Sequence, residues 1–229
     1  MERLFSVFAL TNSDFQRCNM SLTILISAAE AVPFAKSGGL ADVVGSLPKY
    51  LRGLGHDVRL VMPRYYKIDR QKYGLKLLPG VLVVPMGILG NEYCAVYEGA
   101  IPDSDVPVYF LEHEGYFGRG GMYDEGNVEY PDNDRRFIFL SKATLELCKM
   151  LDLHPDIVHA HDWHTAAIPL LLNTSYKNDS HTGNAASVLT IHNMQYQGSF
   201  PSATMEVLDV GWEQFTYRGV EKDDRVNLL

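Results

Sequence analysis

Short apolar runs and helical stripes of apolar positions alternate along the first part of the chain. Leu22–Ala28 is an apolar run that predicts a strand, and the apolar positions of Leu40–Leu54 recur at helical spacing. Asp57–Met62 predicts the next strand. Pro48 lies inside the predicted helix, where its missing N–H and its ring predict a kink or a local break.

The middle of the chain has a different, more β-rich pattern. Leu75–Pro85, Tyr93–Tyr97 and Val106–Leu111 predict strands that Gly, Asn and Pro turns separate. Residues 113–133 combine many Gly, Asp, Asn and Tyr residues with little apolar periodicity, and predict a long ordered loop.

After this loop the alternation of helices and strands resumes. Helical spacing covers Asp134–Leu151 and Thr165–Asn173, and strands are predicted at Ile157–Ala160 and Ser187–Ile191. Strand–helix–strand units of this kind predict an α/β fold with a mostly parallel sheet and helices on both faces.

Composition and charge narrow the class of protein. The 229 residues are enough for one large domain, and a net charge of −8 argues against a nucleic-acid surface or an anionic membrane as the main partner. Cys18, Cys94 and Cys148 form no CxxC pair, which predicts reduced thiols, a cytosol-like compartment and no structural zinc. Residues 1–20 fit neither a signal peptide nor the following pattern; we expect a disordered tail or a short ordered flap before a domain over 21–229.

The segment KSGGLADVVGSLPK joins the first predicted strand to the first predicted helix. The first N–H groups of a helix have no internal partners and carry a partial positive charge, so this turn can hold an anion. Gly38 and Gly39 allow close approach of the backbone, and Lys36 adds a positive charge. The pattern matches neither the dinucleotide fingerprint nor the P-loop, and an ordinary tight turn is the alternative.

Two further polar segments also lie at predicted strand ends. They are HAHDWH (His159–His164) and TIHN (Thr190–Asn193). Because ligands of parallel sheets bind at the carboxyl ends of the strands, we expect both to share one cleft with the turn at Lys36.

The HAHDWH segment has a second interpretation, a metal site in a metallo-hydrolase. Strand alternation places His159 and His161 on one face, whereas His164 lies a turn into the next helix. Metallo-hydrolases with a comparable motif place the aspartate one position later. We therefore expect no metal, with the histidines as buried hydrogen-bonding groups and Asp162 as the cap of the following helix.

Taken together, these motifs resemble a known family. KSGGLADVVGSLPKYLRGLGHDVRLVMPRY, YPDNDRRF, DIVHAHDWHTAAIPLLL and TIHNMQYQGSF are similar, in this order, to the N-terminal domain of bacterial glycogen synthases and plant starch synthases. Those proteins are retaining glucosyltransferases of the two-domain GT-B architecture. The resemblance implies a Rossmann-like domain that is the N-terminal half of such a fold.

The resemblance also implies roles for individual residues. Lys36 and the amides of Gly38 and Gly39 would hold the diphosphate of ADP-glucose. Asp162 would bind sugar hydroxyls near the scissile bond. His192 would contact the donor glucose, with its backbone carbonyl facing the positive charge that develops at the anomeric carbon.

Four further residues receive less specific roles from the resemblance. Asp42 would shape the turn or reach substrate hydroxyls, and a purely structural role is its alternative. Asn193, Gln197 and Tyr123 would line the cleft for donor and acceptor, and Tyr123 could stack on a sugar ring or be an ordinary surface aromatic.

The implied reaction is transfer of glucose from ADP-glucose to the non-reducing end of an α-1,4-glucan with retention, without a cofactor. Such enzymes have a C-terminal domain that supplies the other wall of the cleft, and this chain ends at Leu229. We expect residues 1–229 alone to be nearly inactive, in the cytoplasm or, if the source is a plant, in the plastid stroma. A non-catalytic glucan-binding domain is the remaining alternative.

Overall fold

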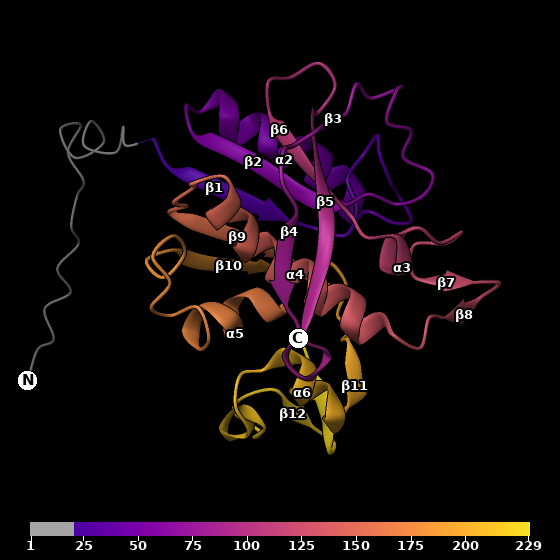
Figure 1. Cartoon of the computed structure of the whole chain (residues 1–229), viewed down its shortest axis with the longest axis vertical. Helices are drawn as coiled ribbons and strands as arrows, with labels where there is room; N and C mark the ends of the chain where they lie inside the picture. Colours follow the sequence, from indigo (N-terminus) through magenta and orange to yellow (C-terminus); the bar gives the residue numbers. More distant parts are fainter. Residues whose placement is uncertain (1–20) are drawn as a thin grey trace, which may run out of the picture.

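The computed structural model describes residues 21–229, and the tail predicted over residues 1–20 lies outside this range. Its centre is an eight-stranded sheet in which β10, β9, β1, β2, β6, β5 and β3 lie side by side in this order and β4 pairs with β5 (Figure 1). A smaller sheet, in the order β11, β13, β12, lies beyond it at the C-terminal end. The predicted α/β class is confirmed.

The bounds of the elements follow in chain order. The strands of the main sheet are β1 (Thr23–Ser27), β2 (Asp57–Pro63), β3 (Lys76–Leu77), β4 (Leu82–Pro85), β5 (Asn91–Ala100), β6 (Pro107–Glu112), β9 (Ile157–His161) and β10 (Ala186–Thr190). The other strands are β7 (Asp124–Glu125), β8 (Val128–Glu129), β11 (Ser199–Pro201), β12 (Glu221–Lys222) and β13 (Arg225–Asn227). The α-helices are α2 (Leu40–Gly53), α3 (Glu114–Phe117), α4 (Asn133–Met150), α5 (Ala167–Asn173) and α6 (Met205–Leu208).

The sheet changes from parallel to antiparallel at β6. Strands β10, β9, β1, β2 and β6 pair in parallel, whereas β5 pairs antiparallel with β6, β3 and β4. Strands β2, β9 and β10 follow the helices α2, α4 and α5, whereas β5 and β6 follow short turns of the middle section. The predicted β-rich middle is therefore the antiparallel edge of the same sheet.

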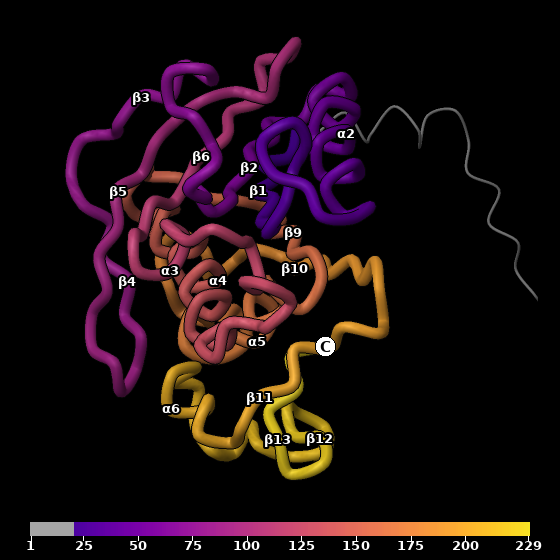
Figure 2. The backbone as a smooth tube through the Cα atoms, turned by 90° about the vertical axis from the view of Figure 1, so that its right-hand side faces the viewer, coloured from indigo at the N-terminus to yellow at the C-terminus, as the bar shows by residue number. Residues whose placement is uncertain are grey.

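Helices cover both faces of the parallel strands, as predicted. Figure 2 shows α2 on one side of these strands and α4 and α5 on the other. The buried hydroxyls of Ser27 in β1 and Thr144 in α4 share a hydrogen bond of 2.8 Å, which fixes α4 against the first strand. Leu25 and Ile26 of β1 are fully buried, so the first predicted strand lies in the middle of the core.

Two details differ from the sequence-based expectation. Helix α2 continues without a break through Pro48, whose buried ring packs inward and offsets part of the cost of its missing N–H. Residues 113–133, predicted as a loop, contain the one-turn helix α3 and the hairpin of β7 and β8.

The segment before α4 is held by a buried arginine at the start of that helix. Arg136 is fully buried and donates hydrogen bonds to the carbonyls of Tyr116 (2.7 Å) and Met122 (2.9 Å) and to Oδ1 of Asn133 (2.6 Å). Its guanidinium also lies 4.8 Å from the centre of the Tyr130 ring. A chain stretch with few apolar contacts of its own is thereby fixed to the core.

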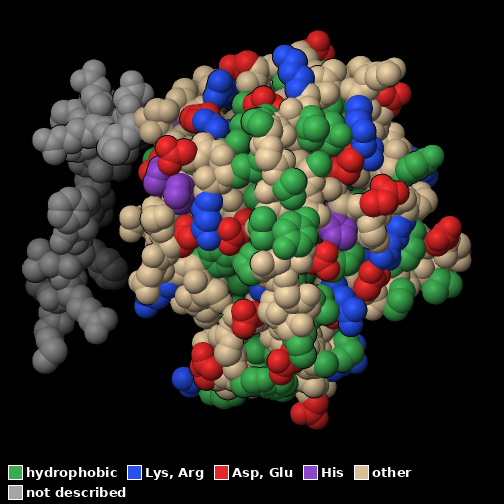
Figure 3. Space-filling view, in the orientation of Figure 1, with side chains coloured by type: hydrophobic (Ala, Val, Ile, Leu, Met, Phe, Trp, Pro, Cys, Tyr) green, Lys and Arg blue, Asp and Glu red, His purple; other side chains and the backbone are tan. Residues whose placement is uncertain are grey.

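Figure 3 shows acidic and basic side chains interspersed on one face of the molecule, with apolar side chains exposed over β4 and β5. None of the helices within residues 21–229 has the length and apolar character needed to cross a membrane.

A close contact between α2 and the segment after β1 generates the first prediction. A Cβ added at Gly45 would lie 2.4 Å from Cγ2 and 2.7 Å from the carbonyl oxygen of Val32. We expect Gly45→Ala to lower the free energy of unfolding by about 1–3 kcal/mol, because the overlap outweighs the higher helix propensity of alanine. Urea denaturation followed by circular dichroism measures this change.

Gly53→Ala is the matched control for this variant. Gly53 is the last residue of the same helix, and an added Cβ there would meet no atom within 4 Å. We expect its stability to stay the same or to rise by up to about 1 kcal/mol. Equal stability of the two variants would contradict the packing that we describe for Gly45.

Candidate functional site

A cleft of about 750 Å³ lies at the carboxyl ends of the parallel strands β1, β9 and β10. The turn before α2, the segment after β9 and the segment after β10 all contribute to its wall. Six predicted site residues line it: Gly38, Gly39, Tyr123, Asp162, His192 and Asn193. The predicted meeting of the three motifs in one cleft is thus observed.

Lys36, Asp42 and Gln197 are not among the lining residues. The Lys36 ammonium lies 2.7 Å from each carboxylate oxygen of Asp42, and both side chains are about half exposed. An exposed ion pair of this kind contributes little to stability, so Lys36 can exchange Asp42 for another anion at small cost. Of the two roles expected for Asp42, the structure shows the first, because its carboxylate binds Lys36 in the turn before α2.

The carboxylate of Glu30 binds the backbone of the turn that precedes α2. Glu30 is 3% exposed and accepts hydrogen bonds from the backbone N–H and the hydroxyl of Ser37 and from the N–H of Gly38 (3.3 Å). The hydroxyl of Tyr123, which comes from the segment before α4, donates to the same carboxylate at 2.5 Å. One buried carboxylate therefore joins three parts of the cleft wall and already binds the Gly38 amide.

Tyr123 is held on two sides. Its ring is stacked on His164 with a centroid distance of 4.8 Å, and its hydroxyl is bound to Glu30. Burial, with the nearby Tyr65 and Glu30, raises the pKa of Tyr123 well above its usual value, so the hydroxyl keeps its proton. Tyr123 is a fixed part of the wall and not an ordinary surface aromatic.

Asp162 joins the ends of β9 and β10. Its backbone has a left-handed φ of 54°, and its Oδ1 accepts a hydrogen bond of 2.6 Å from the backbone N–H of His192. The prediction that Asp162 caps the following helix is wrong: α5 begins at Ala167, and its N-cap is Ala166. The carboxylate instead fixes the position of His192.

A histidine of the HAHDWH segment orients the His192 ring. Nδ1 of His161 lies 2.9 Å from Nε2 of His192, and the two rings are stacked. Nε2 of His161 is buried without a hydrogen-bond partner. Because an unpaired buried acceptor costs less than an unpaired buried N–H, we assign the hydrogen-bonding proton to Nδ1 of His161. Nε2 of His192 then accepts this hydrogen bond, so a neutral His192 ring carries its hydrogen on Nδ1.

The environment keeps the HAHDWH histidines neutral. Burial, with the neighbouring His159 and His192, lowers the pKa of His161 to about 3, and burial with Arg136 lowers the pKa of His164 to about 3. The pKa of His159 is lowered for the same reason, burial, and by His192. Neutral imidazoles in this cluster add no positive charge to the cleft.

These histidines do not converge on a common point. His159 and His161 stack on each other as predicted from strand alternation, whereas His164 lies against Tyr123 and Phe137. Within residues 21–229 the HAHDWH segment contributes no side chain to a group with metal-ligand spacing. The metallo-hydrolase interpretation therefore has no geometric support.

Gln197 lies just before β11 and is hydrogen-bonded to the small C-terminal sheet. Its Oε1 accepts hydrogen bonds from Nζ of Lys222 (2.7 Å) and Nδ2 of Asn227 (2.9 Å). These bonds join the connection between β10 and β11 to β12 and β13, and Gln197 does not line the cleft. Asn193, by contrast, lines the cleft and caps its own turn through the N–H of Gln195.

Acidic side chains that sequence reasoning missed dominate the charge of the cleft. Glu30, Asp124 and Glu129 line it together with Asp162, and no Lys or Arg among the described residues does so. Glu30 follows β1 by three positions, so the strand-end argument used for the other motifs would have found it. The described wall offers backbone N–H groups to an anion, but no Lys or Arg side chain that would balance its negative charge.

Comparisons with known proteins agree with this geometry. The family model of the starch synthase catalytic domain matches residues 23–229. Glycogen synthase 1 of Geobacter sulfurreducens is 65% identical over 208 residues, which are 91% of this chain and 42% of that protein. Glycogen synthase of Treponema denticola is 44% identical over 209 residues, again 91% of this chain and 42% of that protein.

A solved structure of a starch synthase also matches this chain. The catalytic domain of starch synthase IV from Arabidopsis thaliana, bound to ADP and acarbose, matches with a TM-score of 0.81 at 30% identity. The match covers 91% of this chain and 42% of that one. The chain belongs to the starch synthase catalytic domain family, and the Rossmann-like fold expected from the GT-B resemblance is confirmed.

The neutral buried histidines generate a prediction about stability and pH. In the unfolded chain a histidine takes up a proton near pH 6.5, whereas folded His164 does so only near pH 3. The unfolded state binds more protons in between, so stability falls as pH is lowered through this range. We expect His164→Phe to remove about one proton from this dependence, or about 1.4 kcal/mol per pH unit near pH 5. Urea denaturation at pH 5 to 7.5 measures the slope.

Phenylalanine suits this position because His164 packs among aromatic rings and its Nδ1 has no hydrogen-bond partner. The parent chain, measured in the same buffers, is the reference for this slope. An unchanged slope in His164→Phe would show that His164 is not a buried neutral group.

Proposed function

We propose that residues 21–229 form the N-terminal domain of an ADP-glucose-dependent glycogen or starch synthase. In this proposal the enzyme transfers glucose from ADP-glucose to the non-reducing end of an α-1,4-glucan with retention of configuration. The observation that carries it is the cleft where the turn before α2 meets the Asp162–His192 pair, in a chain that matches the family over residues 23–229. The matched starch synthase IV domain was solved with ADP and acarbose, a nucleotide and a sugar ligand.

The chain spans 42% of the length of each of the two glycogen synthases named above. We therefore propose that a second domain forms the opposite wall of the cleft and supplies positive side chains for the diphosphate. The acidic lining of the described wall supports this division, because an anionic donor needs positive charge from another source. The proposed partners are ADP-glucose, the glucan acceptor and this domain, and the proposed compartment is the cytoplasm.

Each motif has a part in the proposed mechanism. The N-terminal end of α2, with Gly39 in the cleft wall, would approach the diphosphate through backbone N–H groups. Asp162 would hold the backbone of His192 so that its carbonyl dipole faces the anomeric carbon, where positive charge develops. His161 would fix the ring of His192 and thereby orient its Nδ1–H, which would donate a hydrogen bond to a sugar oxygen.

Neither alternative from the sequence has an observation in its favour. The HAHDWH histidines do not form a metal-ligand group within the described residues, as a metallo-hydrolase would need. The relatives given above are named glycogen synthase and starch synthase, and none of them is a non-catalytic glucan-binding domain.

Titration of residues 1–229 with ADP-glucose tests the role proposed for Lys36. We expect weak binding that Lys36→Ala weakens about two- to fivefold, as for loss of one exposed charge pair. Asp42→Asn should strengthen binding, because it releases Lys36 from its present partner. Isothermal titration calorimetry at low ionic strength measures each dissociation constant.

Lys49→Ala is the matched control, because it removes the same charge from helix α2, which directly follows the turn that carries Lys36. Nζ of Lys49 binds the carbonyl of Pro102, outside the cleft. Equal weakening by Lys36→Ala and Lys49→Ala would refute a specific contact of Lys36 with the ligand.

The proposed division of the cleft also predicts the activity of this stretch by itself. We expect purified residues 1–229 to incorporate glucose from ADP-glucose into glycogen at least about 100-fold more slowly than a full-length relative, because one wall of the electrostatic site is absent. Radiolabelled glucose incorporation measures the rate. A rate within tenfold of the relative's would overturn the need for a second domain.

A further inference from the structure

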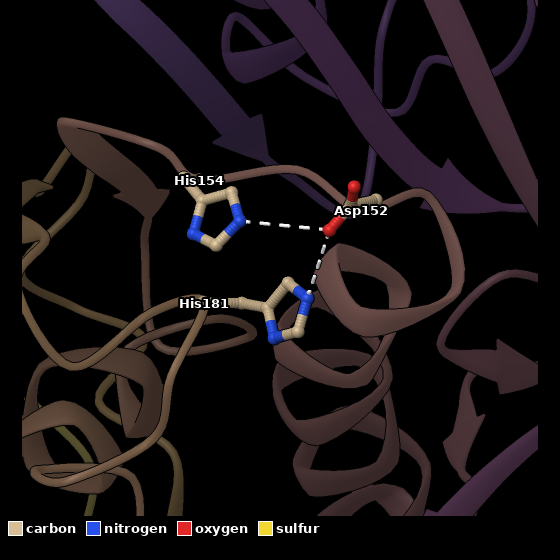
Figure 4. Close-up of side chains that lie close together, drawn as sticks. All are labelled: Asp152, His154 and His181. Atoms are coloured by element: carbon tan, nitrogen blue, oxygen red, sulfur yellow. Dashed lines mark ion pairs between the residues drawn. The ribbon is translucent and has the colours of Figure 1, made fainter.

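A cluster of two histidines and one aspartate lies at the edge of the sheet away from the cleft. Asp152 and His154 belong to the connection between α4 and β9, and His181 belongs to the connection between α5 and β10. Both connections lead into the amino ends of their strands, whereas the cleft lies at the carboxyl ends. Figure 4 shows both imidazole rings directed toward the Asp152 carboxylate.

The ligand atoms of the cluster are already near the separations of a metal site. Nε2 of His154 lies 3.6 Å and Nε2 of His181 lies 3.3 Å from Oδ1 of Asp152. One ligand atom from each of the three residues lies within 4.8 Å of the others. Ligands at about 2.1 Å from a tetrahedral Zn²⁺ are about 3.4 Å apart, so the two Asp–His distances fit without rearrangement.

Only the two histidines must come closer together. Their rings are stacked with centroids 4.7 Å apart and an interplanar angle of 13°. The side chain of His154 is 60% exposed and that of His181 is 21% exposed, so His154 is free to turn toward a fixed His181.

The ring of His181 has a hydrogen-bond partner outside the cluster. Its Nδ1 lies 3.0 Å from the hydroxyl of Ser180, which leaves Nε2 for the cluster. Asp179 accepts hydrogen bonds from the N–H groups of His181 and Thr182 at 3.0 Å and pairs with Lys149 of α4 at 3.1 Å. The turn that carries His181 therefore stays ordered.

We propose that Asp152, His154 and His181 bind one divalent transition-metal ion, with Zn²⁺ as the best-fitting ion. Two imidazoles and one carboxylate suit Zn²⁺ and its neighbours in the first transition series, whereas Mg²⁺ and Ca²⁺ prefer sites made of oxygen ligands. The exposed side of the cluster leaves room for water as the remaining ligand.

A bound ion would cross-link two connections that are distant in sequence. It would join the end of α4 to the polar segment before β10, the strand at one edge of the main sheet. Because the ion binds only when both connections are in place, it stabilises the folded state in proportion to its concentration. The site is structural and separate from the proposed transferase cleft.

Metal titration of the untagged chain tests this proposal. We expect residues 1–229, freed of metal with EDTA and dialysed, to bind one Zn²⁺ per chain with a dissociation constant at or below about 10 µM. Zn²⁺ should raise the Tm, and Mg²⁺ at the same concentration should not. Co²⁺ should give a visible absorption band that Zn²⁺ removes by displacement.

Asp152→Asn and His154→Gln should each weaken Zn²⁺ binding at least tenfold and abolish the Co²⁺ band. Asp103→Asn is the matched control, because Asp103 is also an exposed aspartate with a left-handed backbone, at φ 59° against 50° for Asp152. Asparagine tolerates this conformation, so both variants should fold, which circular dichroism without metal verifies. Absence of Zn²⁺ binding in the parent chain, or equal affinity in Asp152→Asn and Asp103→Asn, would overturn the proposal.

Discussion

The buried carboxylate of Glu30 is the contact on which the cleft depends. It binds the turn before α2 through Ser37 and Gly38, and it binds the segment before α4 through the hydroxyl of Tyr123. Two of its donors are backbone N–H groups near a helix N-terminus, where a negative charge is stabilised. Without this carboxylate the N–H of Ser37 and the hydroxyl of Tyr123 would lose a shared partner, and the two segments would have no common anchor.

Asp162 uses the same principle on the other side of the cleft. Its carboxylate accepts the backbone N–H of His192, and its left-handed backbone turns the chain from β9 toward that contact. Arg136 supports the Tyr123 side of the cleft, because it donates hydrogen bonds to the carbonyls of Tyr116 and Met122 in the segment that carries Tyr123. The cleft is thus built from charged side chains that bind backbone groups, and its shape is fixed before any ligand arrives.

The parts of the fold set by local periodicity could be predicted from the sequence. The helices at α2 and α4 and the strands at β1, β2 and β9 match the predicted ranges within about two residues, because buried apolar stripes determine them. The short α3 and the β7–β8 hairpin could not be predicted. They depend on Arg136 and Asn133, whose contacts lie up to 20 residues away in sequence.

The candidate site shows the same division between local and long-range information. The strand-end rule brought Gly38, Asp162 and His192 together correctly, since it follows from the geometry of parallel strands. The strand-end rule does not tell which side chains are already hydrogen-bonded to other groups of the protein. Gln197 is bound to Lys222 and Asn227, and Asp162 is bound to His192 rather than to the following helix, because these pairings join residues 25 to 30 positions apart.

The acidic lining of the cleft bears on the order of events in the proposed enzyme. Glu30, Asp124, Glu129 and Asp162 face the space in which a dianionic diphosphate would lie. A wall of this charge would bind the donor only weakly by itself, so tight binding of the nucleotide sugar would require the opposite domain. Donor binding and closure of the two domains then become a single thermodynamic step, and an open enzyme would hold no activated sugar for water to attack.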